Sequence, residues 1–185
     1  MLEWIHSVDV SVLNTIQTYL HHPVLDPIFS VVTHLGDGGI LWILLGILLI
    51  CSKKYRKAGI AMLIALGIGA IFANLIVKPI VARPRPFVEF SELELIIPAP
   101  SGYSFPSGHS LASFTGAVIL SWTNRKWIFP SFLMAALIAF SRMYLCVHYF
   151  SDVLTGSVLG VIFGLAAIFI LKKWAKNRED RSLAS

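Results

Sequence analysis

The sequence predicts an all-α fold: a polytopic membrane bundle of about six transmembrane helices. Of its 185 residues, 56% are hydrophobic and only 14% are charged. The apolar residues occur in long uninterrupted runs rather than in the broken stripes of soluble helices. Most basic residues lie between these runs, as they do in proteins whose helices cross a membrane in alternating directions. The whole chain, 1–185, is therefore predicted to be a single membrane-embedded domain.

The first 22 residues are expected to form an amphipathic helix that lies partly in the membrane interface. Its apolar positions recur at helical spacing and are Ile5, Val8, Val12, Ile16 and Leu20. Glu3 and Asp9 stand where a cleavable signal peptide would carry basic residues, so the N-terminus is expected to be retained. Prolines then interrupt the pattern, and residues 24–35 are compatible with either a first crossing or a short re-entrant helix.

Three apolar runs approach the roughly 20 residues that cross a bilayer. They are residues 58–77, 127–145 and 153–171. Two shorter runs, 38–51 and 110–122, are counted as further spans, because each can extend into its flanks or be shielded by neighbouring helices.

The basic residues predict which side of the membrane each end faces. Eleven of the 15 Lys and Arg residues fall within 53–57, 125–126 and the tail 172–185, so these segments and the C-terminus are expected to be cytoplasmic. The net charge of +5 does not indicate nucleic-acid binding, since the basic residues flank apolar spans without base-stacking aromatics. Membrane lipids are the expected partners, and no obligatory protein partner is indicated. Cys51 and Cys146 fall on opposite faces, which excludes a disulfide between them.

The remaining basic residues lie at the outer ends of spans, where the positive-inside rule predicts few. They are Lys78, Arg83, Arg85 and Arg142. The same ends carry Ser107, Gly108, His109, His148 and Asp152. Such an excess of positive charge predicts an anion as the occupant, and the Arg fork with the compact Lys charge suits a phosphoryl group. Ser107 and Gly108 begin a predicted helix, so their backbone N–H groups are expected to be free for the same anion.

His148 and Asp152 are four residues apart, which places both on one helical face. Asp152 can then orient the imidazole so that His148 acts as a nucleophile toward phosphorus. His109 is the candidate acid and base, protonating the leaving oxygen and later accepting a proton from water. Phosphoryl transfer depends mostly on positioning and electrostatics, so neither a metal nor a cofactor is required.

The other histidines are expected to be structural, because a lone histidine near a helix end is most often a hydrogen-bonded structural residue. They are His6, His21, His22 and His34.

The outer segments resemble the three-part signature of the type-2 phosphatidic acid phosphatase superfamily. Its Lys, six residues, Arg-Pro part matches Lys78 to Pro86. Its Pro-Ser-Gly-His part matches 106–109, and its Ser-Arg, five residues, His, three residues, Asp part matches 141–152. No signature position is altered. In its small size, the chain most resembles bacterial phosphatidylglycerophosphatase B and undecaprenyl diphosphate phosphatases.

The resemblance implies a six-helix core and a metal-independent lipid phosphatase, acting on a lipid phosphate or diphosphate at the extracytoplasmic face of the cell membrane. It implies that His148 is the nucleophile, oriented by Asp152, and that His109 is the acid and base. The implied phosphate-binding residues are Lys78, Arg85, Ser107, Gly108 and Arg142. The signature leaves out Arg83, which is free either to contact a second phosphate or to meet lipid headgroups.

Other functions fit parts of the pattern. The same residues could transfer phosphate to another alcohol, or hold vanadate as in the related haloperoxidases, although those are soluble. An anion or lipid transporter or binding protein could also carry a cationic cavity. A transporter is expected to hold its substrate near the midplane, whereas these residues gather at one face, and binding alone has little need for His148 paired with Asp152.

Overall fold

The structure is a computed structural model that describes residues 2–183, and every regular element in this part of the chain is helical. The elements in chain order are α1 (Leu2–Tyr19), α2 (Leu25–His34), η1 (Asp37–Gly39), α3 (Ile40–Cys51), α4 (Arg56–Ile71), η2 (Phe72–Val77), α5 (Lys78–Val81), α6 (Pro86–Glu89), α7 (Gly108–Thr123), η3 (Arg125–Trp127), α8 (Ile128–Tyr144) and α9 (Phe150–Leu183).

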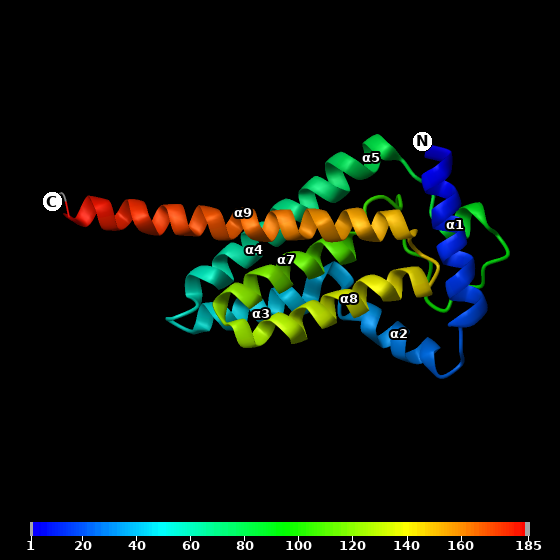
Figure 1. The fold of residues 1–185 in the computed structure, drawn as a ribbon, viewed down its shortest axis with the longest axis horizontal. Helices are drawn as coiled ribbons and strands as arrows, with labels where there is room; N and C mark the ends of the chain where they lie inside the picture. The colour runs from blue at the N-terminus through cyan, green and yellow to red at the C-terminus, as the bar shows by residue number, and fades with distance from the viewer. Residues whose placement is uncertain (1, 184–185) are drawn as a thin grey trace.

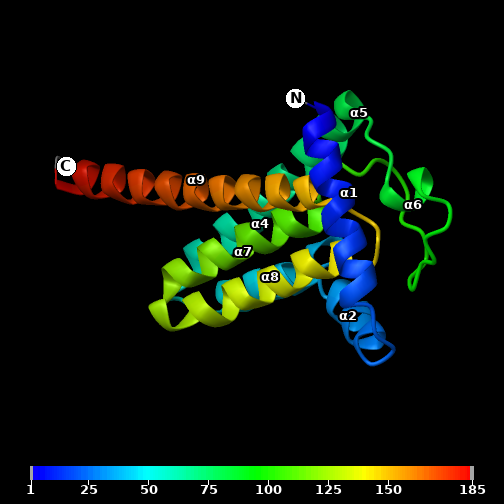
Figure 2. The ribbon, with the colours of Figure 1, turned by 45° about the vertical axis from the view of Figure 1, so that its right-hand side comes forward.

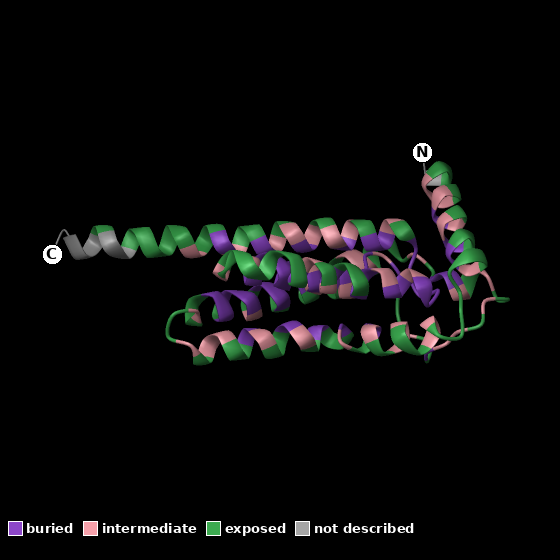
Figure 3. Ribbon diagram, turned by 60° about the horizontal axis from the view of Figure 1, so that its bottom comes forward, coloured by how far each residue is buried: buried purple, intermediate pink, exposed green. Residues whose placement is uncertain are grey.

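Five helices, α3, α4, α7, α8 and α9, run side by side between the two ends of the molecule (Figure 1). Helix α7 lies at the centre, where it packs against α9, α8 and α4. Nine of its 16 residues are buried, and the close contact with α9 depends on small residues. A side chain on Gly160 would meet the backbone of Leu111 at 2.5 Å. Buried residues gather inside the bundle, whereas residues 169–177 of α9 are largely exposed (Figure 3).

Length and composition identify three membrane-spanning candidates, Arg56–Glu89, Arg125–Tyr144 and Phe150–Asn177. These contain the three long apolar runs found in the sequence. A fourth candidate is the pair Leu25–His34 and Asp37–Cys51, which is bent by 44°. The structure therefore confirms a helical membrane protein but does not confirm the predicted number of about six spans. Helix α7 is too short for the same criterion, and most of its apolar residues are buried inside the bundle.

The basic clusters share one end of the bundle. The α3–α4 turn, η3 and the distal part of α9 lie together at that end, and the beginnings of α7 and α9 lie at the other (Figure 1). The predicted alternation of helix directions is thus present. Residues 184 and 185 of the predicted basic tail lie outside the described residues. Neither cysteine forms a disulfide; Cys51 is exposed and Cys146 is buried.

Helix α1 lies across the end of the bundle at which α9 begins (Figures 1 and 2). It ends at Tyr19, three residues before the end of the predicted helix 1–22, and residue 1 lies outside the described part. Its buried positions are Asp9, Leu13 and Ile16, of which Ile16 belongs to the apolar series noted in the sequence and the other two do not. An acidic residue can face inward here because basic and hydroxyl groups of distant segments meet it.

Candidate active site

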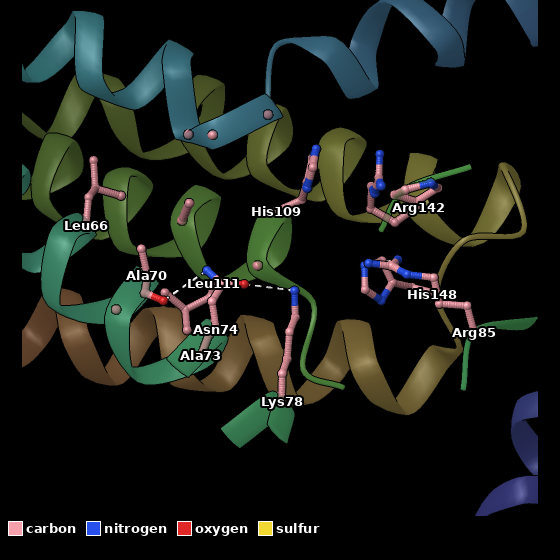
Figure 4. A pocket seen from close by; sticks show the side chains of 17 residues that line it. Leu66, Ala70, Ala73, Asn74, Lys78, Arg85, His109, Leu111, Arg142 and His148 are labelled. Carbon is pink, nitrogen blue, oxygen red and sulfur yellow. Dashed lines mark hydrogen bonds between the residues drawn. The ribbon is translucent and has the colours of Figure 1, made fainter. Parts of the chain in front are cut away.

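The site is a cavity of about 250 Å³ at the end of the bundle opposite the basic clusters. Six of the predicted residues line it: Lys78, Arg85, Gly108, His109, Arg142 and His148. Figure 4 shows His109, Arg142 and His148 extending from different segments into one region. The three signature segments, distant in sequence, are therefore brought together as predicted. Ser107 and Asp152 are fully buried and do not line the cavity.

His148 lies in the short connection between α8 and α9. Helix α8 ends at Tyr144, and the carbonyl oxygen of Arg142 accepts hydrogen bonds from the N–H groups of Val147 and His148, both at 3.1 Å. Cys146, which directly precedes Val147, adopts a left-handed conformation with φ of 57°. Only glycine and a few polar residues adopt this conformation readily. The backbone thus turns sharply, and its hydrogen bonds fix His148 beside Arg142.

The two ring nitrogens of His148 face different groups. Nδ1 lies 3.4 Å from Asp152 Oδ2 and 3.4 Å from Ser104 Oγ. Ser104 also donates a hydrogen bond to Asp152, and the Tyr149 N–H donates to the same carboxylate at 2.9 Å. These contacts hold Asp152 against Nδ1 and leave Nε2 toward the cavity. Burial lowers the pKa of His148 to about 3, so the ring is neutral at pH 7 and Nε2 keeps its lone pair.

Arg85 is fixed by backbone carbonyl groups on both sides of the site. Its Nε donates to Gly102 at 2.9 Å, Nη2 donates to Ser101 at 3.1 Å, and Nη1 donates to Val147 at 2.9 Å. Nη1 also lies 3.3 Å from His148 Nε2. The guanidinium therefore stands directly beside the ring nitrogen that faces the cavity.

Arg142 is held at one end only. Its Nη1 donates to Thr33 Oγ1, and the buried Nε has no hydrogen-bonding partner among the described residues. A buried charged donor without a partner is costly unless a ligand supplies the acceptor. Lys78 reaches the cavity from α5. Its Nζ donates a hydrogen bond to Asn74 Oδ1 at 2.9 Å. Asn74 lies in the π-helical turn η2, a distortion that often occurs at functional sites.

One expectation for the start of α7 was wrong. The N–H of Ser107 is not free, because it donates to the carbonyl oxygen of Asp152 at 3.1 Å. Ser107 caps α7 instead: its Oγ accepts from the Ser110 N–H at 3.3 Å and from the Ser110 hydroxyl at 2.9 Å. The Ser107 hydroxyl proton is not used by either bond. Gly108 lines the cavity as predicted.

The profile of the PAP2 superfamily matches residues 57–176, about two thirds of the chain. The chain belongs to the PAP2 superfamily. The family resemblance noted from the three sequence segments is therefore correct, and all three segments fall inside the matched region.

Relatives of this PAP2 protein include two curated undecaprenyl-diphosphatases. The one from Sulfolobus acidocaldarius is 40% identical over 121 residues, which cover 65% of this chain and 58% of that protein. Undecaprenyl-diphosphatase BcrC of Bacillus subtilis is 32% identical, with 78% of this chain and 74% of the relative covered. The crystal structure of a PAP2 type phosphatidylglycerolphosphate phosphatase from Bacillus subtilis superposes with a TM-score of 0.74 and 26% identity, covering 94% and 87% of the two chains.

Arg83, which lies outside the PAP2 signature, bridges two carboxylates. Its Nη1 donates to Asp152 Oδ1 at 2.8 Å and its Nη2 donates to Asp9 Oδ2 at 2.7 Å, while its guanidinium stacks 4.0 Å from the centre of the Tyr149 ring. The sequence offered two positions for Arg83, at a second phosphate or at lipid headgroups. The structure gives it a third, as part of the support behind His148.

Sequence reasoning also missed three further groups of this PAP2 site: Asp9, Ser104 and Asp37. Asp9 holds Arg83, Ser104 holds Asp152, and Asp37 Oδ1 lies 2.9 Å from His109 Nε2. Asp9 and Ser104 had no local signal, since their partners are distant in sequence. Asp37 had a weak local signal, because an acidic residue flanked by glycines indicates a tight turn.

Proposed function

We propose that this protein hydrolyses a membrane lipid phosphate or diphosphate through a phosphohistidine intermediate on His148. The observation that carries the proposal is the cavity itself. A neutral histidine presents Nε2 beside Arg85, and Arg142, whose buried Nε has no hydrogen-bonding partner among the described residues, lines the same cavity. Cations around a neutral nucleophile match the equatorial oxygens of a phosphoryl group in transfer.

In the first step, His148 Nε2 attacks phosphorus and the bond from phosphorus to the lipid-side oxygen breaks. His109 gives that oxygen a proton as it leaves. Asp152 accepts a hydrogen bond from the Nδ1–H group and stabilises the positive charge that the ring acquires. In the second step, His109 takes a proton from water, whose oxygen attacks phosphorus while the bond to Nε2 breaks. Phosphate is released, and His148 and His109 regain their starting states.

Lys78, Arg85 and Arg142 are proposed to hold the phosphoryl oxygens. Arg85 Nη1 lies 3.3 Å from His148 Nε2, on the side of its lone pair, so substrate oxygens must draw the guanidinium toward themselves before attack. The N–H of Gly108 and the hydroxyl proton of Ser107 are the proposed donors from the start of α7. This role of Ser107 uses its hydroxyl rather than its backbone, since its N–H is engaged.

A lipid substrate is supported by what the cavity offers beside the cations. Leu66, Ala70, Ala73 and Leu111 line the same space, so an apolar chain can lie next to the phosphate. The curated relatives act on undecaprenyl diphosphate, and the solved relative on phosphatidylglycerol phosphate. We propose these two lipids as substrates of this chain.

We further propose that the site faces the extracytoplasmic side and that the C-terminus is cytoplasmic. The end of the bundle that carries the basic clusters is then the cytoplasmic end, as the positive-inside rule requires. About six transmembrane helices remain the prediction, in which α7 crosses within the bundle and α2 adds to the five parallel helices.

The test is phosphate release by the protein purified in detergent with EDTA present. Phosphatidylglycerol phosphate and undecaprenyl diphosphate serve as substrates. His148→Ala is expected to lose at least about 10³-fold of the activity, and His22→Ala, which changes an exposed histidine, is the matched control. Acid-labile phosphate bound to His148 is expected in quenched wild-type reactions. A folded wild type without release from either lipid, or full release by His148→Ala, would return the transferase and transporter functions to first place.

A further inference from the structure

The site contains a second histidine–carboxylate pair, separate from His148 and Asp152. Asp37 Oδ1 lies 2.9 Å from His109 Nε2, and its Oδ2 lies 2.7 Å from His34 Nδ1. Asp37 is not in any of the three sequence segments that identify the family, and His34 was expected to be a structural residue without a role. The carboxylate is thus held between two imidazoles, one of which, His109, lines the cavity.

The backbone around Asp37 is shaped for this contact. Helix α2 ends at His34, α3 begins at Ile40, and the turn between them contains three glycines. Gly38 and Gly39 have φ angles of 58° and 75°, which few other residues adopt. Gly36 is packed so closely that a Cβ atom there would lie 2.6 Å from His109 Cδ2. The turn therefore lets the His109 ring lie directly against the chain, with Asp37 at its Nε2 edge.

The contact decides which nitrogen of His109 can act. A carboxylate only accepts hydrogen bonds, so Nε2 must carry the hydrogen of the pair. Nδ1 has no partner among the described residues, and His109 lines the cavity. Nδ1 is therefore the nitrogen available to give or take a proton at the substrate.

The charges around His109 make a carboxylate necessary there. Burial lowers the pKa of His109 to about 4, and the positive charges of Arg142 and Lys78 act in the same direction. Asp37 is the acidic group that reaches it in the described part of the chain. Asp37 favours the imidazolium that a general acid must form between turnovers.

We propose that Asp37 is a positioning residue that orients His109 and stabilises its protonated form for proton transfer to and from the lipid phosphate. The inference rests on the proposed hydrolysis. As the lipid-side oxygen leaves phosphorus, the Nδ1 proton of His109 moves to it. As water attacks the phosphohistidine, its proton returns to Nδ1, and the imidazolium is again paired with Asp37. His34 holds the other carboxylate oxygen, so that Asp37 is gripped from both sides.

The test compares Asp37→Asn with His109→Ala on two substrates, using the full chain in detergent. The lipid phosphate has an alkoxide leaving group that needs a proton, whereas p-nitrophenyl phosphate releases a phenolate that does not. On the lipid, Asp37→Asn is expected to lower kcat about 10²-fold with little change in KM. On p-nitrophenyl phosphate, both variants are expected to give a burst of nitrophenol equal to the enzyme concentration, followed by slow turnover, because phosphorylation no longer limits but water attack still needs the base.

A pH profile separates positioning from a loss of structure. The alkaline limb of kcat is expected to move to lower pH in Asp37→Asn, because the imidazolium loses its carboxylate. Asp37→Glu is expected to recover part of the activity. Glu92→Gln, an exposed acid of the outer loop, is the control and is expected to match wild type. Since the Asp37 side chain is 54% exposed, its replacement is not expected to unfold the protein.

The outcomes distinguish this inference from the proposed function. If wild type is active, His109→Ala is impaired and Asp37→Asn is fully active on the lipid, the positioning role is wrong while the hydrolase remains. Equal losses on both substrates, with no burst and an unmoved pH limb, also overturn the role. If His148→Ala is as active as wild type, the proposed mechanism itself fails.

Discussion

Removing the Asp9 carboxylate tests whether α1 supports the site or merely covers it. Asp9 is 1% exposed, and its two oxygens accept hydrogen bonds from Arg83 Nη2 at 2.7 Å, the Ser151 N–H at 2.7 Å and the Ser151 hydroxyl at 2.6 Å. Deleting one partner of a buried ion pair typically costs about 3–5 kcal/mol. Arg83 keeps Asp152 and the Tyr149 ring in Asp9→Ala, so we expect the lower end, about 3 kcal/mol.

The assay uses the chain's own reporter. In a Cys51→Ser background, Cys146 is the one remaining thiol, and it is buried beside His148. A thiol-reactive dye then follows thermal unfolding at the site. For a chain of this size, about 3 kcal/mol corresponds to a lowering of Tm by about 6–12 °C. The matched control is Glu3→Ala, which removes an exposed carboxylate from the same helix and should change stability by less than about 0.5 kcal/mol.

The Asp9→Ala variant should also lose catalytic activity. Arg83 also donates to Asp152 Oδ1, so loss of Asp9 leaves the guanidinium free to shift and loosens the carboxylate behind His148. Below the melting temperature we expect kcat to fall by about tenfold. A stability loss of less than about 1 kcal/mol, or an equal effect of Glu3→Ala, would refute the view that α1 is energetically joined to the site.

Further predictions address the nucleophile, the anion and the glycine turn. Between pH 7 and pH 5 the free energy of unfolding of wild type should fall by about 2 kcal/mol more than that of His148→Gln, because an unfolded histidine binds a proton below pH 6.5 while the folded pKa is about 3; thermal unfolding at both pH values measures this, and parallel curves would contradict it. Inorganic phosphate should raise Tm of wild type but not of Arg142→Gln, since the partnerless Nε of Arg142 is the proposed anion donor; equal shifts in a thermal titration would count against that role. Gly36→Ala should abolish lipid phosphatase activity, whereas Gly67→Ala, whose added Cβ meets nothing within 4 Å, should not; initial rates of phosphate release decide between them.

Most of the fold could be predicted because the membrane imposes simple rules. Long apolar runs marked α4, α8 and α9, and the positions of basic residues predicted helix directions that the structure has. Helix α7 was predicted from a short run only by assuming protein neighbours, and its nine buried residues support that assumption. The number of spans could not be predicted in the same way, because the bent pair α2 and α3 and the crosswise α1 do not follow a simple length rule.

The orientation of α1 shows where periodicity fails. In the sequence, Asp9 served only as evidence against a cleavable signal peptide and was given no partner in the fold. In the structure Asp9 is buried, because Arg83 and Ser151 satisfy it from segments more than 70 residues away. A buried charge with partners distant in sequence leaves no signal in the local pattern.

The same limit applies to the site. His148, Asp152 and His109 could be chosen from the sequence because their spacing and neighbouring residues form a recognisable motif. The groups that hold these residues in place, such as Arg83 and Asp37, lie outside the motif. Their supporting contacts became evident only from the interatomic distances in the structure.

The two histidine–carboxylate pairs differ in exposure, and the difference suits the proposed division of labour. The side chains of His148 and Asp152 are 2% and 0% exposed, so the nucleophile stays neutral and away from competing water. Asp37 is 54% exposed, and His109 is 17% exposed. An acid and base must regain its proton state at each turnover, which requires contact with solvent, whereas a nucleophile is weakened by hydration. Exchanging the environments, by burying Asp37 or opening the pocket around Asp152, is therefore expected to impair opposite steps: water attack in the first case and phosphorylation in the second.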